Sequence, residues 1–371
     1  ARLGPAIAGH LAADGLPAEP LTATGLTFAA ADGGRRHHCE ENGAFGDPRP
    51  FASVVVCTRN RPESLTRTIA SVLELDYPSF ELVIVDNSPE EAGTLAAVSA
   101  VGDPRVRYVA EPRPGLSCAR NRGLSVAEGE LIAFTDDDVV VDRLWLASLA
   151  RAFTRSPLIG CVTGLVPTAE LRTAEQSLFD RIVSWSSSMR PRIVDPREHP
   201  ADDPLFPYRT GRLGTGANFA LSRAAARDVG PFDEALGAGA PAGGGEDLDY
   251  FLRALDHQWS IAVEPAAIAW HYHRADRTAL QRQLYTYGSG AMAYGIKHAL
   301  VPRHAARLTR LLVSQFAQGN RRPFGGVIGG AVEPSLGESL TRARRRGRIA
   351  GPYLYAKGRL RNRGHTPWRI S

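Results

Sequence analysis

The stretch SVVVCTRNRPESLTRTIASVLELDYPSFELVIVD, residues 53–86, predicts the fold class of this chain. It begins and ends with short apolar runs, SVVVC and ELVIVD, which are typical of buried strands. Between them, residues 62–75 place Leu65, Ile69 and Val72 at helical spacing, after a proline in the first turn. Two apolar strands joined by an amphipathic helix indicate a parallel βαβ unit.

The alternation of strand and helix continues downstream. VRYV (106–109) and ELIAFT (130–135) have the pattern of strands, and residues 116–127 and 143–153 have the pattern of helices. We therefore predict an α/β fold with a Rossmann-like, mostly parallel central sheet and helices on both faces. Ligands of such sheets bind beyond the carboxyl ends of the strands, so the polar residues that follow each apolar run are the first candidates for a site.

The second half of the chain is less regular. Strand patterns recur at residues 159–166 and 216–223, and in the two short runs 260–263 and 267–270. Five glycines in residues 237–245 precede a helical pattern, and from about residue 276 the chain looks mostly helical. We predict three regions, which are an N-terminal accessory segment (1–50), an α/β domain (51–295) and a helical, basic C-terminal region (296–371).

The net charge of +5 is concentrated near the C-terminus. Residues 342–363 contain nine Lys and Arg and no acid, whereas the rest of the chain has 35 basic and 39 acidic residues. Because aromatic and aliphatic residues are interleaved with the charges, this segment predicts contact with an anionic membrane surface or another polyanion. A solvated, partly disordered tail is the alternative. We expect no nucleic-acid binding, since no recognised module accompanies the charge.

The cysteines and the apolar runs indicate in which cellular compartment the protein is expected. The cysteines are scattered without a CxxC pair, which disfavours a zinc site of that type and a disulfide framework. No apolar run approaches the ~18 residues of a membrane-spanning helix, and no stretch has the features of a signal peptide. We expect a cytoplasmic protein, with peripheral contact at the inner face of the membrane as an open alternative.

Three consecutive aspartates follow the predicted strand in ELIAFTDDD, residues 130–138. Asp136 and Asp138 can aim at one point where the chain leaves strand geometry, and their repulsion would push their pKa values apart. A hard divalent cation such as Mg²⁺ or Mn²⁺ would neutralise both and bridge to substrate phosphates. The alternative is a solvated loop whose aspartates cap a helix.

Four motifs stand in one order along the chain. They are VVVCTRNRPESL, VIVDNS, PGLSCARNRGL followed by FTDDD, and GGGEDLDYFLRAL followed by WHYH. Together they closely resemble family 2 glycosyltransferases, over roughly residues 52–295. The resemblance implies a GT-A fold, a nucleotide-sugar donor with a UDP-sugar as the expected form, and a divalent cation, Mg²⁺ or Mn²⁺.

The resemblance assigns donor binding to residues near the ends of the predicted strands. Asp86 would contact the base or ribose, although it could instead cap a turn, and Arg120 could instead pair with the neighbouring acids. Asp136 is expected to face the ribose, while the role of Asp137 stays open between a bystander and a sugar contact. Gly216 would let the backbone approach the donor closely. The expected donor-binding residues are Thr58, Arg59, Asn60, Asp86, Arg120, Asn121, Asp136, Asp137, Gly216 and Asn218.

For the metal, the resemblance points to Asp138 and to a histidine that follows a short strand ending in Trp. His271 directly follows Trp270, and His273 lies on the same side of an extended chain. We expect His271 to be the ligand and His273 to contact it or a phosphate. A reversal of the two histidines, or a purely structural role, remains open.

Glu246 and Asp247 begin a helix after three glycines. The resemblance implies that this acidic pair supplies the general base, which takes the proton from the acceptor hydroxyl. We expect Asp247 to be the base and Glu246 to support it, with Asp249 as a weaker candidate. The alternative is simple compensation of the helix dipole by acids in the first turn.

Taken together, the motifs predict an inverting, metal-dependent glycosyltransferase. It would move a sugar from a nucleoside-diphosphate sugar to a hydroxyl group of a saccharide, a lipid-linked glycan or a small molecule. Two alternatives stay open: a polyprenyl-phosphate glycosyltransferase at the membrane, and a non-catalytic nucleotide-sugar-binding protein.

Overall fold

The computed structural model describes residues 49–370, except 184, 186–188, 199–202, 204 and 318–336. Residues 44–371 form one compact unit. The predicted N-terminal segment therefore lies almost entirely outside the described residues. Of the cysteines within them, Cys57, Cys118 and Cys161 are free and buried.

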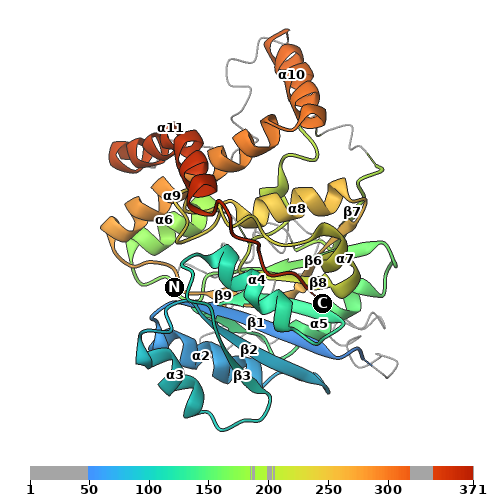
Figure 1. Cartoon of the computed structure of the whole chain (residues 1–371), viewed down its shortest axis with the longest axis vertical. Helices are drawn as coiled ribbons and strands as arrows, with labels where there is room; N and C mark the ends of the chain where they lie inside the picture. Colours follow the sequence, from blue (N-terminus) through green and yellow to red (C-terminus); the bar gives the residue numbers. More distant parts are fainter. Residues whose placement is uncertain are drawn as a thin grey trace, which may run out of the picture. The chain divides into compact units, whose positions relative to one another are not determined.

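The first half of the domain is a parallel sheet built as the sequence predicts (Figure 1). Its strands run side by side in the order β3-β2-β1-β4, and all three pairings are parallel. Thr58 pairs with Asp86, and Cys57 pairs with Asp136, so the polar ends of three strands meet at one edge. The elements are β1 (Ala52–Thr58), α2 (Pro62–Leu73), β2 (Phe80–Asp86), α3 (Ala92–Ser99), β3 (Val106–Ala110), α4 (Leu116–Val126) and β4 (Leu131–Asp136).

The second half extends this sheet with mixed pairing. Strand β8 is antiparallel to both β4 and β6, β9 is parallel to β6, and the short strands β5 and β7 are antiparallel to β9. The two runs that we expected at 260–263 and 267–270 form one strand, which continues through Pro265 with a shift in register. The elements are β5 (Val139–Val141), α5 (Trp145–Phe153), β6 (Ile159–Leu165), α6 (Ala174–Val183), β7 (Arg192–Val194), β8 (Asn218–Ser222), α7 (Arg223–Val229), α8 (Glu246–Asp256) and β9 (Ser260–His271).

Helices cover both faces of the sheet, which confirms the predicted α/β architecture. Alternate residues of β1 point to opposite sides: Val54 and Val56 pack in one hydrophobic core with α2 and α5, while Val55 packs in a second core with α4 and α8. Strands buried on both faces must be apolar at every position, which explains the unbroken runs in the sequence.

The C-terminal region is helical, as predicted, and the basic segment is part of it. Helices α9 (Arg277–Ala299) and α11 (Gly337–Arg361) lie side by side, with α10 (Pro302–Ala317) between them in the chain (Figure 1). The two helices approach closely because glycines meet backbone at the crossing: a Cβ at Gly288 would overlap the Arg344 carbonyl, and one at Gly347 would overlap the Tyr285 carbonyl. None of the described helices is long and apolar enough to cross a membrane.

Candidate active site

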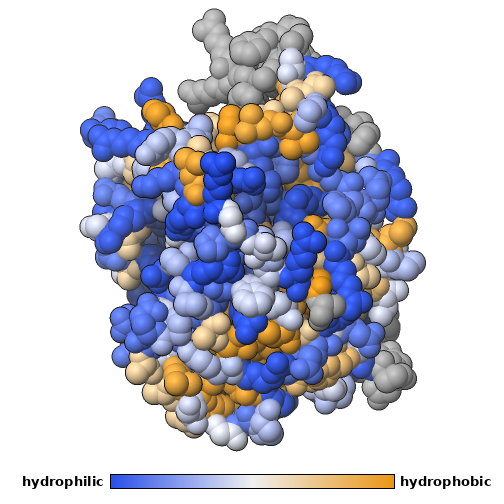
Figure 2. Space-filling model, in the orientation of Figure 1, coloured by the Kyte–Doolittle hydropathy of each residue, from blue (hydrophilic) through white to orange (hydrophobic). Residues whose placement is uncertain are grey.

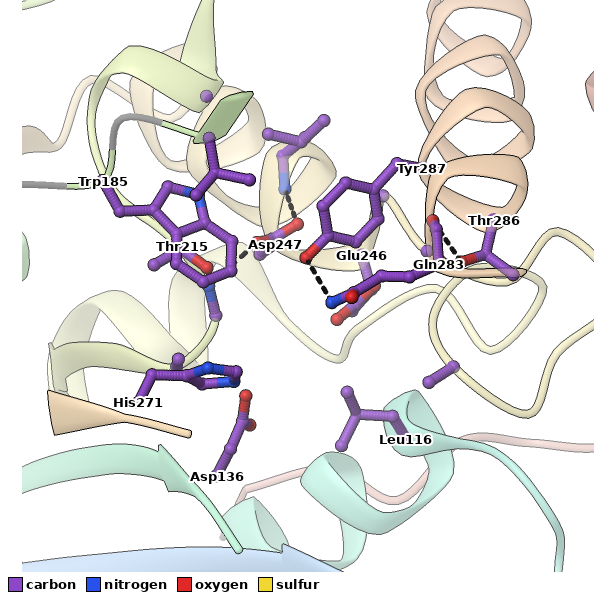
Figure 3. Close-up of a pocket in the computed structure, with 18 of the residues that line it drawn as sticks. Leu116, Asp136, Trp185, Thr215, Glu246, Asp247, His271, Gln283, Thr286 and Tyr287 are labelled. Carbon is purple, nitrogen blue, oxygen red and sulfur yellow. Dashed lines mark hydrogen bonds between the residues drawn. The ribbon is translucent and has the colours of Figure 1, made fainter. Parts of the chain in front are cut away.

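A cavity of about 1310 Å³ opens beyond the carboxyl ends of β1 and β4. Its walls also include the start of α4, the glycine-rich loop before α8, the first turn of α8, and one side of α9. Figure 3 shows Asp136 and His271 close together, with Trp185 near His271 and Tyr287 and Gln283 projecting from α9. The cavity therefore lies where a doubly covered parallel sheet is expected to bind ligands.

The aspartate run and the end of β9 create a group of metal-ligand type. Val139 pairs with His271 across β5 and β9, so the chain just after Asp138 is held beside the histidine. Nε2 of His271 lies 3.3 Å from Oδ1 of Asp138. One ligand atom each from Asp136, Asp138 and His271 fall within 4.8 Å of one another.

These three side chains fit a divalent cation. Burial and the neighbouring carboxylates raise the pKa of Asp136 to about 6, although Arg120 opposes this shift. At Asp138 the effect of burial is outweighed by His271 and Arg61, which hold the pKa of that carboxyl below its usual range. Two carboxylates and an imidazole are donors that suit Mn²⁺ or Mg²⁺. Asp136, which the resemblance directed toward the ribose, lies among the candidate ligands.

Asp137 points away from this group and anchors the turn between β1 and α2. It is 5% exposed, and its carboxylate accepts hydrogen bonds from Thr58 Oγ1 at 2.7 Å and Arg61 Nη1 at 2.9 Å. The same Arg61 nitrogen lies 3.0 Å from Oδ2 of Asp138. Arg61 was missed in the sequence analysis, although its position at the end of TRNR after a buried strand could have indicated it.

Arg120 lines the cavity and joins several of its walls through hydrogen bonds and an ion pair. It is 2% exposed, and it donates hydrogen bonds of 2.9 Å to Glu246 Oε1 and to the Gly216 carbonyl. Its guanidinium also lies 3.5 Å from Asp136. These contacts are those of the alternative in which Arg120 pairs with the neighbouring acids. A side chain at Gly216 would strike this guanidinium, so the glycine makes room for Arg120 rather than only for a ligand.

Glu246 and Asp247 differ in environment although they are neighbours. Glu246 is buried on Arg120, and burial together with the adjacent Asp247 charge raises the pKa of Glu246 to about 7. Asp247 lines the cavity, and its two oxygens accept hydrogen bonds of 2.8 Å from the backbone N–H groups of Gly216 and Leu248. Asp249 is fully buried on the other side of α8, against Arg253, Lys297 and His298.

Two of the residues that we expected to contact the donor do not line the cavity. Asn121 is fully buried and clamps Phe232 through that residue's N–H and carbonyl groups. Asn218 is also fully buried, where it donates to the carbonyls of Leu165 and Ala267. The amides of these two residues hold strands and loops together and do not line the cavity, in contrast to the expected direct donor contacts.

Asp86 and Asn60 also lie outside the cavity lining, whereas Thr58 and Arg59 are part of it. Asp86 is buried and accepts hydrogen bonds from the N–H of Ser88 and the hydroxyl of Tyr108. Asn60 is exposed and has a positive φ of 52°, which makes it the bend that turns the chain from β1 into α2. The next residue after Asp86, Asn87, does line the cavity.

His273 stands in the WHYH motif but does not line the cavity. It is buried and bonds to His271 through their Nδ1 atoms at 3.0 Å, so it contacts the metal-type group through His271.

The remaining walls come from segments outside the four motifs. Six arginines of the C-terminal half line the cavity, and only the number of arginines in that half could have indicated this. Further lining residues missed in the sequence analysis include Trp185, Arg192, Arg209, Arg212, Arg274, Arg282, Gln283, Tyr287 and Arg344.

The mixed sheet with the acidic group at its edge has the arrangement of a GT-A fold. The fold is similar to that of a mannosyltransferase from Pyrobaculum calidifontis solved in complex with GDP-Man and Mn²⁺, with a TM-score of 0.50 and 17% identity over 85% of this chain and 88% of that one. Residues 53–226 match the model of glycosyl transferase family 2.

Two curated relatives match part of the chain. A pre-mycofactocin glycosyltransferase of Mycobacterium tuberculosis is 28% identical over 256 residues, which are 66% of this chain and 48% of the relative. A glucosyl-dolichyl phosphate glucuronosyltransferase of Haloferax volcanii is 33% identical over 117 residues, which are 31% of this chain and 37% of the relative. The chain thus spans about half the length, or less, of these relatives.

Proposed function

We propose that this protein transfers a sugar from a nucleoside-diphosphate sugar to an acceptor hydroxyl, with inversion at the anomeric carbon. The observation that carries the proposal is that Asp247 faces the same cavity as the group of Asp136, Asp138 and His271. A base and a diphosphate site on one cavity are the two parts that a single displacement requires.

Asp136, Asp138 and His271 would hold the divalent cation. When bound there, Mn²⁺ or Mg²⁺ would neutralise charge that develops on the departing nucleoside diphosphate. Thr58 and Arg59, which line the cavity beside α2, would bind the nucleotide part of the donor. A UDP-sugar is the donor we propose to test first, with a GDP-sugar as the comparison.

Asp247 would act as the general base. As the acceptor oxygen bonds to the anomeric carbon, its proton passes to a carboxylate oxygen of Asp247, and the bond to the diphosphate breaks with its electron pair on the phosphate oxygen. Two backbone N–H groups fix the orientation of this carboxylate. Glu246 would position it indirectly, because Glu246 holds Arg120, and Arg120 holds the carbonyl of the same Gly216 whose N–H binds Asp247.

The direct test is a panel of nucleoside diphosphates in a thermal-shift assay, followed by turnover with the donor that binds. We expect UDP to raise the melting temperature more in the presence of Mn²⁺ than without it. An equal rise in melting temperature with and without Mn²⁺ would contradict the proposed role of Asp136 and Asp138 in binding the metal. Donor binding without any transfer across a broad acceptor panel would favour the alternative of a non-catalytic binding protein.

A polyprenyl-phosphate acceptor at a membrane surface is the second candidate. Arg282 and Arg344 face the cavity from α9 and α11, and burial beside Arg348 lowers the pKa of Arg344 to about 10. The outward side of α11 exposes Ile349 and Tyr353 among its basic residues, and Figure 2 shows hydrophilic and hydrophobic residues mixed over this helix. A basic helix with exposed apolar side chains suits an anionic lipid surface.

Sedimentation with vesicles tests this candidate on the full chain. We expect binding to phosphatidylserine vesicles but not to neutral ones, and loss of binding when the exposed Arg345 and Arg346 are both changed to Glu. The matched control is Arg227→Glu, an exposed arginine on α7, which should leave vesicle binding unchanged. Equal sedimentation of all three proteins would count against the membrane contact.

A further inference from the structure

A second group of ligand-type side chains lies outside the cavity, where α8 and α9 end and α10 begins. It consists of Asp256, His298 and His304, one from each of these helices. Each offers one ligand atom, and the three atoms lie within 4.8 Å of one another. Both histidines are buried, at 3% and 5% exposed, whereas Asp256 is nearer the surface.

One nitrogen of each imidazole is already held in place by a hydrogen-bond partner. Nε2 of His298 lies 3.0 Å from Oδ1 of Asp249, and Nδ1 of His304 lies 3.0 Å from the hydroxyl oxygen of Tyr208. Histidines that bind metals almost always donate their other ring N–H to a carboxylate or another oxygen, which fixes the tautomer and the ring orientation. Both histidines have such a partner here.

The other ring nitrogens supply the second observation. Nδ1 of His298 is buried and has no hydrogen-bond partner among the described residues. With the proton on Nε2 for Asp249, Nδ1 carries a bare lone pair, and such a buried group is costly unless something binds it. Nε2 of His304 faces Asp256 Oδ2 at 2.9 Å.

An ordinary ion pair explains only part of this arrangement. It accounts for His304 and Asp256, but it leaves His298 Nδ1 without a role. Arg303 also approaches Asp256, at 3.3 Å, yet its side chain is 69% exposed and can turn away into solvent. Ligand atoms around a tetrahedral Zn²⁺ are about 3.4 Å apart, so separations of up to 4.8 Å need to shorten by no more than about 1.4 Å.

We propose that Asp256, His298 and His304 bind a divalent cation of the Zn²⁺ type and that this ion fastens α10 to α8 and α9. Two imidazoles and one carboxylate suit Zn²⁺ better than Mg²⁺, because Mg²⁺ favours oxygen ligands and two of the three donors here are nitrogens. Three protein ligands leave a coordination position for water. The site is separate from the cavity, so it does not depend on the proposed sugar transfer.

The test counts metal on the full chain after removal of bound ions with EDTA and equilibration with Zn²⁺ alone. The background variant is His271→Gln, so that the cavity group cannot contribute its imidazole. We expect the further change His304→Gln to remove one equivalent of Zn²⁺ and to abolish a Zn²⁺-induced rise of a few degrees in melting temperature. Equal zinc content with and without His304 would overturn the proposal.

Two milder variants keep the test decisive if His304→Gln folds poorly. Tyr208→Phe keeps the ring and removes only the hydroxyl on His304, so zinc should bind about 10–100-fold more weakly at this site. Arg303→Gln removes a competing cation, so zinc should bind as well as before or more tightly. Unchanged affinity in Tyr208→Phe, or weaker binding in Arg303→Gln, would leave the group as a structural His–Asp contact.

Discussion

Asp247→Asn is the substitution that tests the proposed mechanism most directly. The side chain keeps its shape, but a neutral amide cannot accept the proton of the acceptor hydroxyl. Loss of a general base lowers kcat about 10²–10⁴-fold, which is about 3–5 kcal/mol in the activation barrier. The binding of the nucleoside diphosphate should change little, because Asp247 is not among the candidate metal ligands.

The structure also sets the cost of this change to stability. Each carboxylate oxygen of Asp247 accepts one backbone hydrogen bond of 2.8 Å. In the asparagine variant one of these contacts brings two N–H donors together, so we expect a loss of about 1–3 kcal/mol in the free energy of unfolding. The melting temperature should therefore fall moderately, and kcat must be measured well below it.

The assay compares kcat at saturating donor, the dissociation constant of the diphosphate with Mn²⁺, and thermal unfolding. The matched control is Asp276→Asn, an acid in the same cavity whose asparagine can still cap α9 by accepting from the Ala279 N–H. We expect kcat of the control to stay within about threefold of the original. A fall of less than 10-fold for Asp247→Asn, or an equal loss of diphosphate binding, would refute the assignment of the base.

Three further predictions follow from other parts of the structure. Removal of divalent cations with EDTA should abolish transfer, and Mn²⁺ should restore it in the unmodified protein but not in Asp138→Asn; activity that persists in EDTA would contradict a metal-dependent mechanism. Gly347→Ala should lower the melting temperature by several degrees in thermal unfolding, since its Cβ would overlap the Tyr285 carbonyl, whereas Ala at Gly211, where the Cβ would only make an ordinary contact with Leu248, should cost far less. Asp249→Asn should cost about 3–5 kcal/mol at pH 7 in urea unfolding, because it leaves Arg253 and Lys297 without their buried partner.

The buried carboxyl of Asp249 also makes the free energy of unfolding depend on pH. Burial alone would raise the pKa of this carboxyl, but Lys297 and Arg253 outweigh it and hold the pKa well below its usual range. A carboxyl with a lowered folded-state pKa contributes stability above its unfolded pKa of about 3.9, and this contribution is lost as pH falls. Urea unfolding from pH 7 to pH 3 should thus show a smaller loss of stability in Asp249→Asn than in the original chain.

Much of the fold could be read from periodicity. The strands buried on both faces leave unbroken apolar runs, and the amphipathic helices leave a 3.6-residue repeat, so β1, α2, β2, α4 and β4 were predicted close to their observed bounds. The joining of two short runs into β9 was not predicted, because a proline inside a run favours a break. The parallel pairing of β9 with β6 carries the strand past Pro265 with a shift in register, and pairing with a distant strand leaves no local signal.

The sequence indicated some residues of the candidate site and missed others, again because contacts between distant segments leave no local signal. Residues at strand ends and at the start of α8 stand in recognisable motifs, so Asp136, Asp138 and Asp247 could be singled out. Asn121 and Asn218 stand in motifs too, but whether an amide faces a ligand or a neighbouring backbone depends on packing that the motif does not contain. Arg344 lies in a basic stretch next to the exposed Arg345 and Arg346, and no local feature of the sequence distinguishes it from them.

By itself, the sequence determined the layered α/β fold, the family-type motifs and the chemical types available at the edge of the sheet. Only the tertiary structure decided which of those groups meet. Register between β5 and β9 brings His271 to Asp138, and the burial of Arg120 separates the roles of Glu246 and Asp247. The reason is physical: periodicity reports which face of an element is buried, whereas the contacts between side chains depend on how distant elements pair and pack.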